Sequence, residues 1–514
     1  MISGSVQTPA NVTHYAKGLT MKMLQTSKVD PEKLSAWEKE NFYNGADCLI
    51  TREVFDVLEP QLDHHTSRTY AFSRELQGPV LEMRLRGVLV DQERREMVVD
   101  TYFDQLGELE IRLERIVREG VGMVGFNWRS NDNLKELFYD RLGIPAIKYQ
   151  GRVTVNRSAL ERMEQYLIAR PIISYIKTMR DIGKKISVLK TDIDADGRIR
   201  TSYNIGGTNT GRLSSSMSEF GTGGNLQNIE DLLRSIFVAD PGMKMAYFDA
   251  EQGESRVVGG IEYALFGDDR YLDACESGDL HTTVAKLVWP ALSWTGDVSI
   301  DKEMAERPYY RHYSRRFMCK KIGHGTNYAG KPRTLAEQAK VDVDLIEEFQ
   351  PVYFKAFPAH LKWHAHVERT LRDNGTLISL LGRKRQFWGR RTDASTLREA
   401  IAYDPQGSLA DIVNRGGLQL WRSGTCQLLM QVHDAWVVQY REEEEDEIIP
   451  KILSLLRYPV KIRDRELIIP YGVQTGWNFG HYDETTNPLG LKNYKSTDRR
   501  VRPAPVRILD RIVR

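Results

Sequence analysis

The stretch Met243-Lys-Met-Ala-Tyr-Phe-Asp-Ala-Glu-Gln-Gly-Glu-Ser-Arg256 carries the strongest signal for the fold of this chain. Its first half, residues 243–248, has the apolar content and the length of a buried strand. Asp249 ends that strand, and four more polar side chains follow within two helical turns: Glu251, Gln252, Glu254 and Arg256. So much polarity is costly to bury unless it has a task. Asp249 is either part of a functional site or simply the N-cap of the helix that follows.

A second carboxylate stands in a matching setting later in the chain. Two apolar runs, residues 428–432 and 436–438, flank His433-Asp434, a pattern typical of a hairpin whose turn presents Asp434. Two carboxylates raised from neighbouring strands can share a pair of Mg²⁺ ions about 4 Å apart, an arrangement used for in-line attack at phosphorus. Mg²⁺ needs only a few carboxylates together with substrate phosphates and water. Asp249 and Asp434 are therefore candidate metal ligands.

A row of basic and aromatic side chains supplies a candidate phosphate-binding face. Arg316, Lys320, His324 and Tyr328 recur at every fourth residue, so on a helix they lie along one slowly drifting face. Two cations and an imidazole on one face suit a triphosphate. The alternative is a basic helix face that is merely solvated.

Together the three stretches resemble motifs A, B and C of the family A DNA polymerases, in the same chain order. The matching positions are Asp249, Gln252, Glu254 and Arg256 in motif A, Arg316, Lys320, Gly325 and Tyr328 in motif B, and residues 432–434 in motif C. Residues 210–215 and 225–229 resemble the T-G-R-L-S-S and N-L-Q-N-I signatures of the same family. The chain is similar to a phage or bacterial member that lacks most of the 3′→5′ exonuclease domain.

The resemblance implies an α+β fold, the right-hand polymerase with thumb, palm and fingers. In this fold the palm sheet is antiparallel, and the thumb and fingers are mainly helical. The implied division is 1–70 (end or remnant of an exonuclease-like domain), 71–193 (thumb and entry to the polymerase domain), 194–262 (palm with motif A), 263–377 (fingers with motif B), 378–485 (palm with motif C) and 486–514 (basic C-terminal tail). Within the palm, we expect one strand over residues 198–204 and a closing strand over 470–477.

The resemblance also implies a template-directed DNA polymerase that adds dNTPs to a primer 3′-hydroxyl by two-metal-ion nucleotidyl transfer, in replication or repair. Asp249, Asp434 and the main-chain carbonyl of Ala250 are then ligands of two Mg²⁺ ions, for which Mn²⁺ can substitute. Lys320 is the expected proton donor to pyrophosphate. The expected nucleotide contacts are Arg316, Lys320, His281, Gln252, Glu254, His324 and Tyr328, with Glu254 excluding a 2′-hydroxyl. The expected contacts to primer-template DNA are Arg212, Asn225, Gln227, Arg398, Gln406 and His433.

The sequence departs from the family pattern at several positions. Ala435 stands where the family has an acidic residue after the motif C aspartate, so the metal site keeps two carboxylates. Ala402 occupies a position where Asn is usual, and His324 one where Phe or Tyr is usual. Between residues 215 and 225 lies a Gly- and Ser-rich insertion that is longer than the family pattern.

Residues 43–47, Tyr-Asn-Gly-Ala-Asp, resemble the Y-x3-D motif at the end of the proofreading domain of these polymerases. The D-x-E motif that should precede it would end an apolar strand, whereas the D-x-E string found in residues 1–42, Asp30-Pro-Glu32, follows no apolar run and stands where we expect a helix to begin. Because exonuclease chemistry needs the full set of carboxylates for two metals, we expect no proofreading by this chain alone. Two explanations stay open. The segment is either a remnant kept as a structural shelf, or part of a split enzyme whose separately encoded exonuclease subunit docks on residues 1–60.

Composition sets broad limits on the setting of this chain. The formal net charge of its 514 residues is only +2, so contacts to nucleic acid must come from local basic patches. The four cysteines have no disulfide or metal spacing, which fits a reducing compartment. No apolar run approaches the roughly 18 residues of a membrane span, so we expect no membrane partner. We expect a cytoplasmic protein of a bacterial or phage-infected cell, without excluding an organelle.

Two other functions compete with a DNA polymerase. A single-subunit RNA polymerase shares the palm and the two aspartates, but Glu254 in the sugar-gating position favours deoxynucleotides. A catalytically silent DNA-binding or structural protein would not need the set Asp249, Asp434, Arg316 and Lys320. The basic tail over residues 492–514 is either a solvated segment or one that binds DNA or a partner.

Overall fold

The computed structural model describes residues 34–218, 221–310 and 313–494. The chain forms two compact units, Met1–Phe72 and Ser73–Arg514. Much of the predicted docking segment (residues 1–60) and of the basic tail (residues 492–514) therefore lies outside the described residues.

In the first unit, helix α2 (Ala36–Leu58) begins at a capping box in which Ser35 and Glu38 satisfy each other's backbone N–H groups. Tyr43 and Asp47 lie one turn apart on α2, and the Tyr43 hydroxyl bonds the Asp47 carboxylate.

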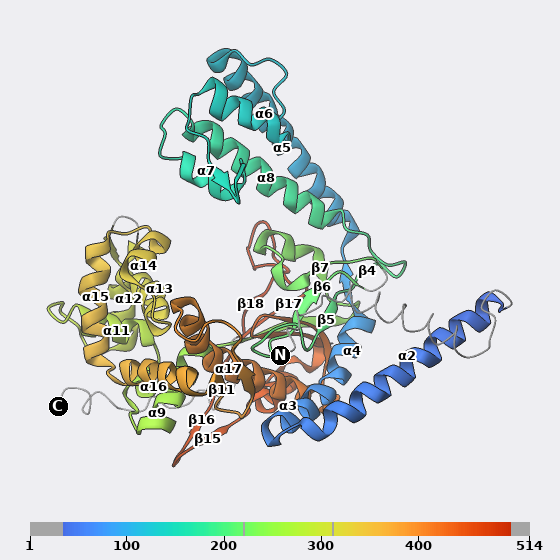
Figure 1. Ribbon diagram of the computed structural model, residues 1–514, viewed down its shortest axis with the longest axis vertical. Coiled ribbons are helices and arrows are strands. Elements are labelled where there is room, and N and C mark those ends of the chain that lie inside the picture. The colour runs from blue at the N-terminus through green and yellow to red at the C-terminus, as the bar shows by residue number, and fades with distance from the viewer. Residues whose placement is uncertain (1–33, 219–220, 311–312, 495–514) are drawn as a thin grey trace. The chain divides into compact units, whose positions relative to one another are not determined.

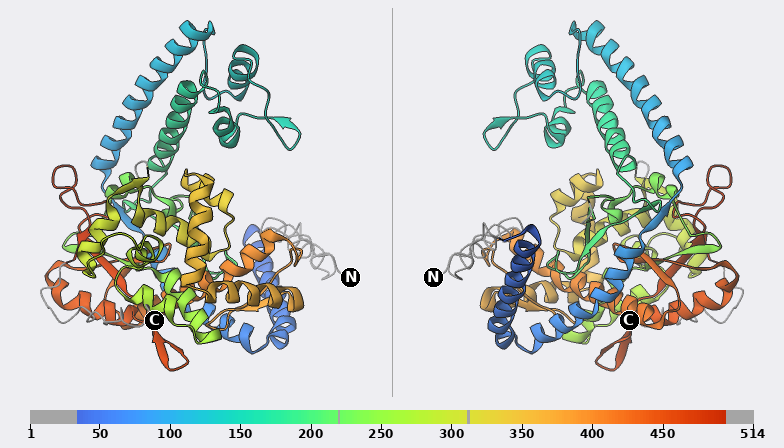
Figure 2. Two further views of the ribbon diagram at one scale, coloured as in Figure 1. Left: turned by 90° about the vertical axis from the view of Figure 1, so that its left-hand side faces the viewer. Right: turned by 90° about the vertical axis from the view of Figure 1, so that its right-hand side faces the viewer.

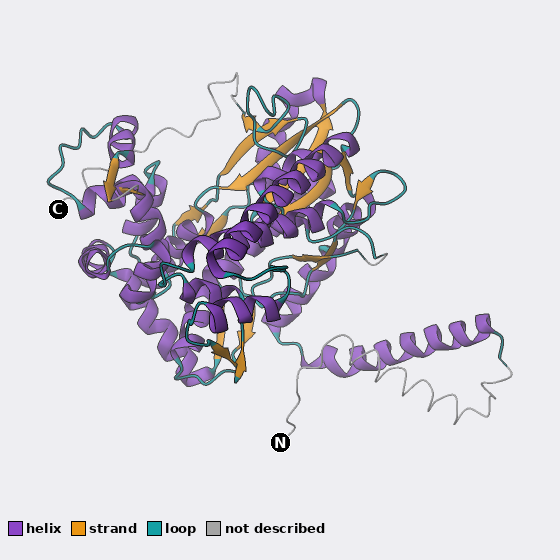
Figure 3. Cartoon of the chain, turned by 90° about the horizontal axis from the view of Figure 1, so that it is seen from above, coloured by secondary structure: helices purple, strands orange, loops and turns teal. Residues whose placement is uncertain are grey.

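The second unit is built around a five-stranded antiparallel sheet in the order β13-β14-β8-β17-β18. The strands are β13 (Gln427–Val432), β14 (Ala435–Arg441), β8 (Met243–Ala250), β17 (Tyr471–Gly476) and β18 (Lys492–Asn493). Figure 3 shows strands of this unit side by side, with helices against them. The predicted strand at 243–248, the hairpin around His433-Asp434 and the closing strand are confirmed.

One face of this sheet is covered by helix α17 (Ala394–Ser423). Trp436 on β14 packs directly on Gly417, where a side chain would clash with the indole ring. The Trp436 indole N–H also donates to the carbonyl of Val413 at 3.1 Å. Large apolar side chains of β8 and β14 fill this layer, so the central strands are fixed and their ends are held in place.

The predicted single strand over residues 198–204 is wrong. The segment forms two short strands in different sheets, β4 (Arg198–Ile199) and β5 (Ser202–Asn204). β4 belongs to a three-stranded sheet with β1 (Val88–Val90) and β7 (Phe237–Val238), whereas β5 pairs with β6 (Ser214–Ser216).

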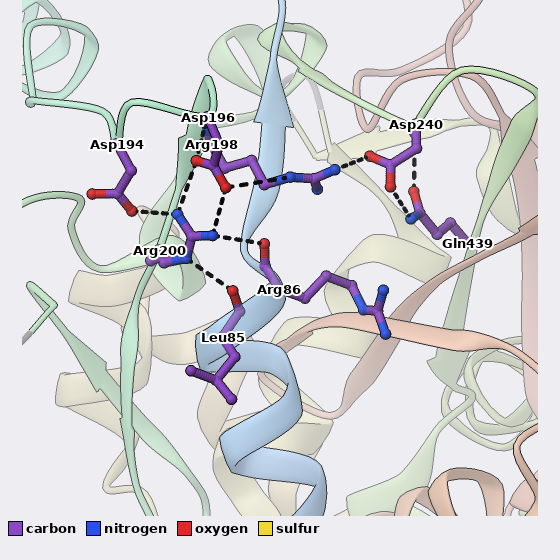
Figure 4. A network of polar contacts seen from close by, with 8 residues as sticks. All are labelled: Leu85, Arg86, Asp194, Asp196, Arg198, Arg200, Asp240 and Gln439. Atoms are coloured by element: carbon purple, nitrogen blue, oxygen red, sulfur yellow. Dashed lines mark hydrogen bonds and ion pairs between the residues drawn. The ribbon is translucent and has the colours of Figure 1, made fainter.

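The break between the two strands falls at Arg200, whose side chain ties together three parts of the unit (Figure 4). Its Nε donates to the carbonyl of Leu85 at 3.0 Å, at the end of helix α4 (Gln77–Arg86). Its terminal nitrogens donate to Asp194 at 2.6 Å and to Asp196 at 2.7 Å. Local alternation of side chains cannot reveal this set of partners, because they come from separate segments.

Arg198 extends the same network to the central sheet (Figure 4). Its Nη2 lies 2.7 Å from Oδ1 of Asp240, and Oδ2 of Asp240 accepts a hydrogen bond from Nε2 of Gln439 at 2.8 Å. Gln439 is fully buried on β14. The three-stranded and five-stranded sheets are thus joined by charge-assisted hydrogen bonds, which are the stronger kind.

Two long helices, α5 (Gln92–Val121) and α8 (Arg170–Leu189), pack side by side (Figures 1 and 2). Asp91 caps α5 by accepting a hydrogen bond from the Arg94 N–H. Apolar residues of α8 are buried at helical spacing, among them Ile172, Ile176 and Met179. The elements between them are α6 (Asn131–Lys135), the π-helix η3 (Glu136–Arg141), β2 (Lys148–Tyr149), β3 (Arg152–Val153) and α7 (Arg157–Met163).

Eight helices occupy most of residues 253–374, and most carry labels in Figure 1. They are α9 (Gly253–Phe266), α10 (Arg270–Glu276), α11 (Leu280–Val288), α12 (Val298–Glu306), α13 (Arg315–Asn327), α14 (Pro332–Ala339), α15 (Val343–Ala356) and α16 (Ala359–Asn374). The short strands β9 (Pro308–Tyr310) and β10 (Tyr313–Ser314) precede α13.

The remaining elements are short. They are η2 (Glu59–Gln61), α3 (His64–Glu75), η4 (Leu226–Asn228), η5 (Asp231–Ile236), the pair β11 (Thr376–Ile378) and β12 (Lys384–Gln386), η6 (Glu442–Glu444), α18 (Glu445–Leu456), and the pair β15 (Val460–Ile462) and β16 (Arg465–Leu467). The prediction of an α+β chain with an antiparallel central sheet is confirmed. No helix in the described ranges is both long and apolar enough to cross a membrane.

Candidate active site

Two carboxylates lie at adjoining strand ends of the central sheet. Ala435 on β14 pairs with Asp249 on β8, so Asp434 lies one residue beyond the partner of Asp249. The turn places His433 in the left-handed region at φ 55°, exposed, while Asp434 is half-buried. The strand register therefore brings the two predicted metal ligands together.

The electrostatics of this pair favour a bound cation. Burial raises the pKa of Asp249, and the nearby charge of Asp434 raises it further. Burial also raises the pKa of Asp434, although the guanidinium of Arg212 opposes that shift. Within the described residues, no group of three or more His, Cys, Asp and Glu side chains is arranged to hold a metal. Two carboxylates and a main-chain carbonyl suit Mg²⁺, which takes its other ligands from substrate and water.

Glu254 is the centre of a second polar cluster. Its Oε1 accepts a hydrogen bond from Nη2 of Arg212 at 2.6 Å, and the same nitrogen lies 2.9 Å from Oδ2 of Asp434. Its Oε2 accepts from the Tyr328 hydroxyl, and Nε2 of His324 lies 3.9 Å away. Burial and the charge of Glu254 raise the pKa of Tyr328, so its hydroxyl keeps the proton. Arg212, predicted to contact DNA, here bridges two carboxylates.

Arg316 does not extend freely from its helix. Its Nε and Nη2 donate to the two oxygens of Asp279 at 2.8 and 3.0 Å, and Nη1 lies 3.3 Å from Glu306. Asp279 also caps α11 through the Thr282 N–H. His281 stands two residues after Asp279. Burial lowers the pKa of His281 to about 4, so its imidazole is neutral near pH 7.

These groups line one cavity of about 1,040 Å³. Its wall includes Asp249, Ala250, Gln252, Glu254, His281, Arg316, Lys320, His324 and Asp434, as well as two cations that the motifs did not indicate, Lys302 and Lys321. Asp279 also lines it; residues 279–282, Asp-Leu-His-Thr, resemble a D-x-H-T pattern of the family, but a role was predicted only for His281. Tyr328 is not part of the wall but reaches it through Glu254.

Gln252 occupies the junction between β8 and α9. Its backbone is left-handed at φ 52°, which is uncommon for a residue with a side chain. Its side-chain Oε1 is buried and has no hydrogen-bond partner. This acceptor is therefore free to accept a hydrogen bond from a molecule in the cavity.

The other predicted DNA contacts have varied surroundings. Asn225 caps the short helix η4, and Gln227 is buried with its Nε2 donating to the carbonyl of Leu213 at 3.0 Å. Arg398 is exposed on α17, and Gln406 is half-buried on the same helix. The structure does not bring these four side chains into one cluster with the cavity residues.

A buried polar network lies behind helix α13, and the motifs gave no sign of it. Nδ1 of His360 lies 2.7 Å from Oε1 of Glu262, an ion-pair contact that is not aligned as a hydrogen bond. Nε2 of His360 lies 2.9 Å from Oδ1 of Asn327, which also accepts from Tyr353 at 2.7 Å. Nδ2 of Asn327 donates to the Tyr271 hydroxyl at 2.8 Å. This network connects α9 with the end of α13.

The comparison with known proteins agrees with the sequence motifs. A profile described as DNA polymerase family A matches residues 99–480. DNA polymerase I of Chloroflexus aurantiacus is 28% identical over 84% of this chain and 45% of its own length. The thermostable DNA polymerase I of Thermus aquaticus is 26% identical over 88% of this chain and 54% of its own length. The chain thus spans about half the length of the curated relatives it matches.

The fold is also similar to a solved structure. The POL domain of Pol1 from M. smegmatis, in complex with DNA primer-template and dNTP, superimposes with a TM-score of 0.65 at 23% sequence identity. The match covers 86% of this chain and 74% of that chain. At this level of identity the likeness establishes the fold, and the predicted right-hand polymerase fold is confirmed.

Proposed function

We propose that this chain, which belongs to DNA polymerase family A, extends a DNA primer along a template with dNTPs. The observation that carries the proposal is the placement of Asp249 and Asp434 at adjoining strand ends, in the wall of a cavity that also holds the cations Lys302, Arg316, Lys320 and Lys321. A triphosphate needs such a combination of metal-binding carboxylates and positive side chains. Primer-template DNA and dNTPs are the proposed partners.

Asp249, Asp434 and the carbonyl of Ala250 are the groups that would hold two Mg²⁺ ions. When bound, such a pair lowers the pKa of the attacking hydroxyl and neutralises charge on the leaving group. The raised pKa values of the two aspartates support this assignment. They mean that the ionised carboxylates are disfavoured by their surroundings, and a bound divalent cation would stabilise the ionised forms.

The residues of α13 and α11 position the triphosphate in this proposal. Asp279 holds the Arg316 fork at a fixed angle, so less side-chain freedom is lost when phosphate oxygens bind. Lys320 is exposed towards the cavity and is the proposed proton donor to pyrophosphate. His281 is neutral, so it acts as a hydrogen-bond donor and not as a third charge.

Glu254 and Tyr328 form the proposed sugar-selecting wall. The Tyr328 hydroxyl and Arg212 fix both oxygens of Glu254, so the carboxylate cannot swing away from a 2′-hydroxyl without losing both bonds. Because both oxygens of Glu254 already accept hydrogen bonds from the protein, the carboxylate would select against a ribonucleotide by occupying the space of its 2′-hydroxyl. This fixed geometry supports a preference for deoxynucleotides over ribonucleotides.

Several expectations enter the proposal unchanged: the assignment of thumb, palm and fingers to residue ranges, the cytoplasmic setting, and the open choice between a remnant of an exonuclease domain and a separately encoded exonuclease subunit.

Primer extension tests the proposal directly. Purified chain is incubated with primer-template and either dNTPs or rNTPs, with and without Mg²⁺, for the wild type and for Asp249→Asn, Asp434→Asn and Asp140→Asn. Asp140 is exposed and does not line the cavity, so it serves as the matched control. We expect loss of more than about a hundredfold in turnover only for the first two variants, with DNA affinity retained. Retention of activity by either would refute the two-carboxylate site.

A further inference from the structure

We propose that Trp388 is a stacking platform for an unpaired nucleotide of the template strand, an inference that rests on the proposed function. The Trp388 side chain is 85% exposed, more than any other large apolar side chain in the described part of the chain. It lies between β12 and α17. A single exposed ring is ordinary on a protein surface, but this ring is held in a fixed position beside a small cavity and uncompensated positive charge.

The backbone on both sides of Trp388 is fixed. The preceding residue, Phe387, is buried, donates its N–H to the carbonyl of Gly375 at 2.9 Å and packs edge-on against Tyr403. The following residue, Gly389, leaves no room for a side chain, because a Cβ would lie 2.6 Å from Oγ1 of Thr396. A ring presented from a fixed position loses little freedom on binding, which favours its use as a platform.

The surrounding charge favours a polyanion. Residues 383–391 contain five Arg and Lys residues and no acid. Arg383 and Arg385 are paired with Asp411 and Glu399. Arg391 donates to two main-chain carbonyls at the end of α16, which leaves its charge uncompensated. Among the described residues, no carboxylate lies within ion-pair distance of Arg390 or Arg391.

A small cavity of about 240 Å³ opens beside the ring. Trp388 lines it together with Gln386, Asn209 and the ion pair of Arg385 and Glu399, so the uncompensated charge comes from the neighbouring Arg390 and Arg391. Asn209 is three residues before Arg212, in the segment that reaches the active site. Two amides that can bond base edges, an aromatic face and unpaired cations form the combination by which proteins hold single-stranded nucleic acid. A template strand is the single strand that this protein must handle beside that segment.

The test compares two substrates: a primer-template with an unpaired 5′ template extension and the blunt duplex of the same sequence. Affinities are measured by fluorescence anisotropy for the wild type, Trp388→Ala, Trp388→Phe and Trp37→Ala. Trp37 is 73% exposed in the first unit and is the matched control. A 2-aminopurine placed in the unpaired extension reports stacking independently. Because Trp388 packs on little, its variants should fold, and thermal unfolding verifies this.

We expect the unpaired extension to raise wild-type affinity about tenfold, the value of one stacked base. Trp388→Ala should lose that increment and the 2-aminopurine quenching, Trp388→Phe should keep part of both, and Trp37→Ala should keep all. Affinity for the blunt duplex should not change. An increment that survives Trp388→Ala, or an equal loss on both substrates, overturns the inference. If wild type binds no primer-template at all, the proposed function itself fails.

Discussion

Asp279 and Arg316 form a two-pronged ion pair, with Nε to Oδ2 at 2.8 Å and Nη2 to Oδ1 at 3.0 Å, across 37 positions of the chain. The carboxylate is nearly buried, and the guanidinium of Arg316 keeps the pKa of Asp279 low even though burial acts in the opposite direction. One side of the Arg316 fork is thus occupied by protein, and its direction into the cavity is set before any ligand arrives.

Asp279→Asn should therefore weaken dNTP binding although Asp279 carries the wrong charge for a phosphate. Losing the buried carboxylate frees the Arg316 fork, and we expect KM for dNTP to rise about tenfold, with a smaller change in kcat. Glu306→Gln is the control, because its contact with Arg316 is 3.3 Å long and its side chain is 51% exposed. Steady-state kinetics in which both variants behave alike would contradict the positioning role.

Sugar selectivity should depend on Glu254 and, more weakly, on Tyr328. Glu254→Ala opens the space beside the sugar, and we expect use of rNTP relative to dNTP to rise by about tenfold or more. Tyr328→Phe removes one of the two bonds that fix the carboxylate and should raise it by a few-fold only. Competing incorporation of matched rNTP and dNTP measures the ratio. An unchanged ratio in Glu254→Ala would exclude the gate.

The contribution of His281 to dNTP binding should not depend on pH. With a pKa of about 4, His281 stays neutral, so His281→Gln should raise KM for dNTP by the same factor at pH 6 and pH 8. Steady-state kinetics at the two pH values measure the factor. A factor that is clearly larger at pH 6 than at pH 8 would contradict a neutral His281.

The contribution of His364 to folding stability should be lost as the pH drops from about 6.5 to about 4. Burial lowers the pKa of His364 to about 4, so in that window the unfolded chain takes up a proton that the folded chain refuses. His364→Gln should remove part of the slope, on the order of 2–3 kcal/mol across the window. Burial raises the pKa of Asp404 to about 6, and this acts in the opposite sense, because the folded chain keeps a proton between about pH 4 and 6. Urea unfolding at pH 5 and pH 7 measures the difference; a steeper slope in the variant would reverse the assignment.

Local patterns were enough to predict the parts of the site that depend on neighbours in the chain. The apolar run of β8, the hairpin that presents Asp434 and the four-residue spacing on α13 are all visible in short windows, and all three elements are present. The placement of Asp249 beside Asp434 follows from them, because adjoining strands with ends in register place both carboxylates at one edge.

Partnerships between distant segments could not be predicted in this way. Arg212 meets Asp434 across 222 positions and Arg316 meets Asp279 across 37, and no periodicity encodes either pair. The strand expected over residues 198–204 breaks at Arg200 for a similar reason. Its side chain donates to the distant carbonyl of Leu85 as well as to the nearby carboxylate of Asp194, and the backbone of Gly223 packs against its carbonyl, so that a Cβ there would lie 1.9 Å away.

The buried network behind α13 has an evolutionary consequence. Removing Glu262 alone would leave Nδ1 of His360 without a partner in the buried interior, at a cost of roughly 1–3 kcal/mol. Exchanging Glu262, His360 and Asn327 together for apolar residues of similar volume, with Tyr271 and Tyr353 changed to Phe, can be nearly neutral. Single steps between the two states pass through poorly stable intermediates. The five positions should therefore be inherited as a block, and homologues should carry either the whole polar set or none of it.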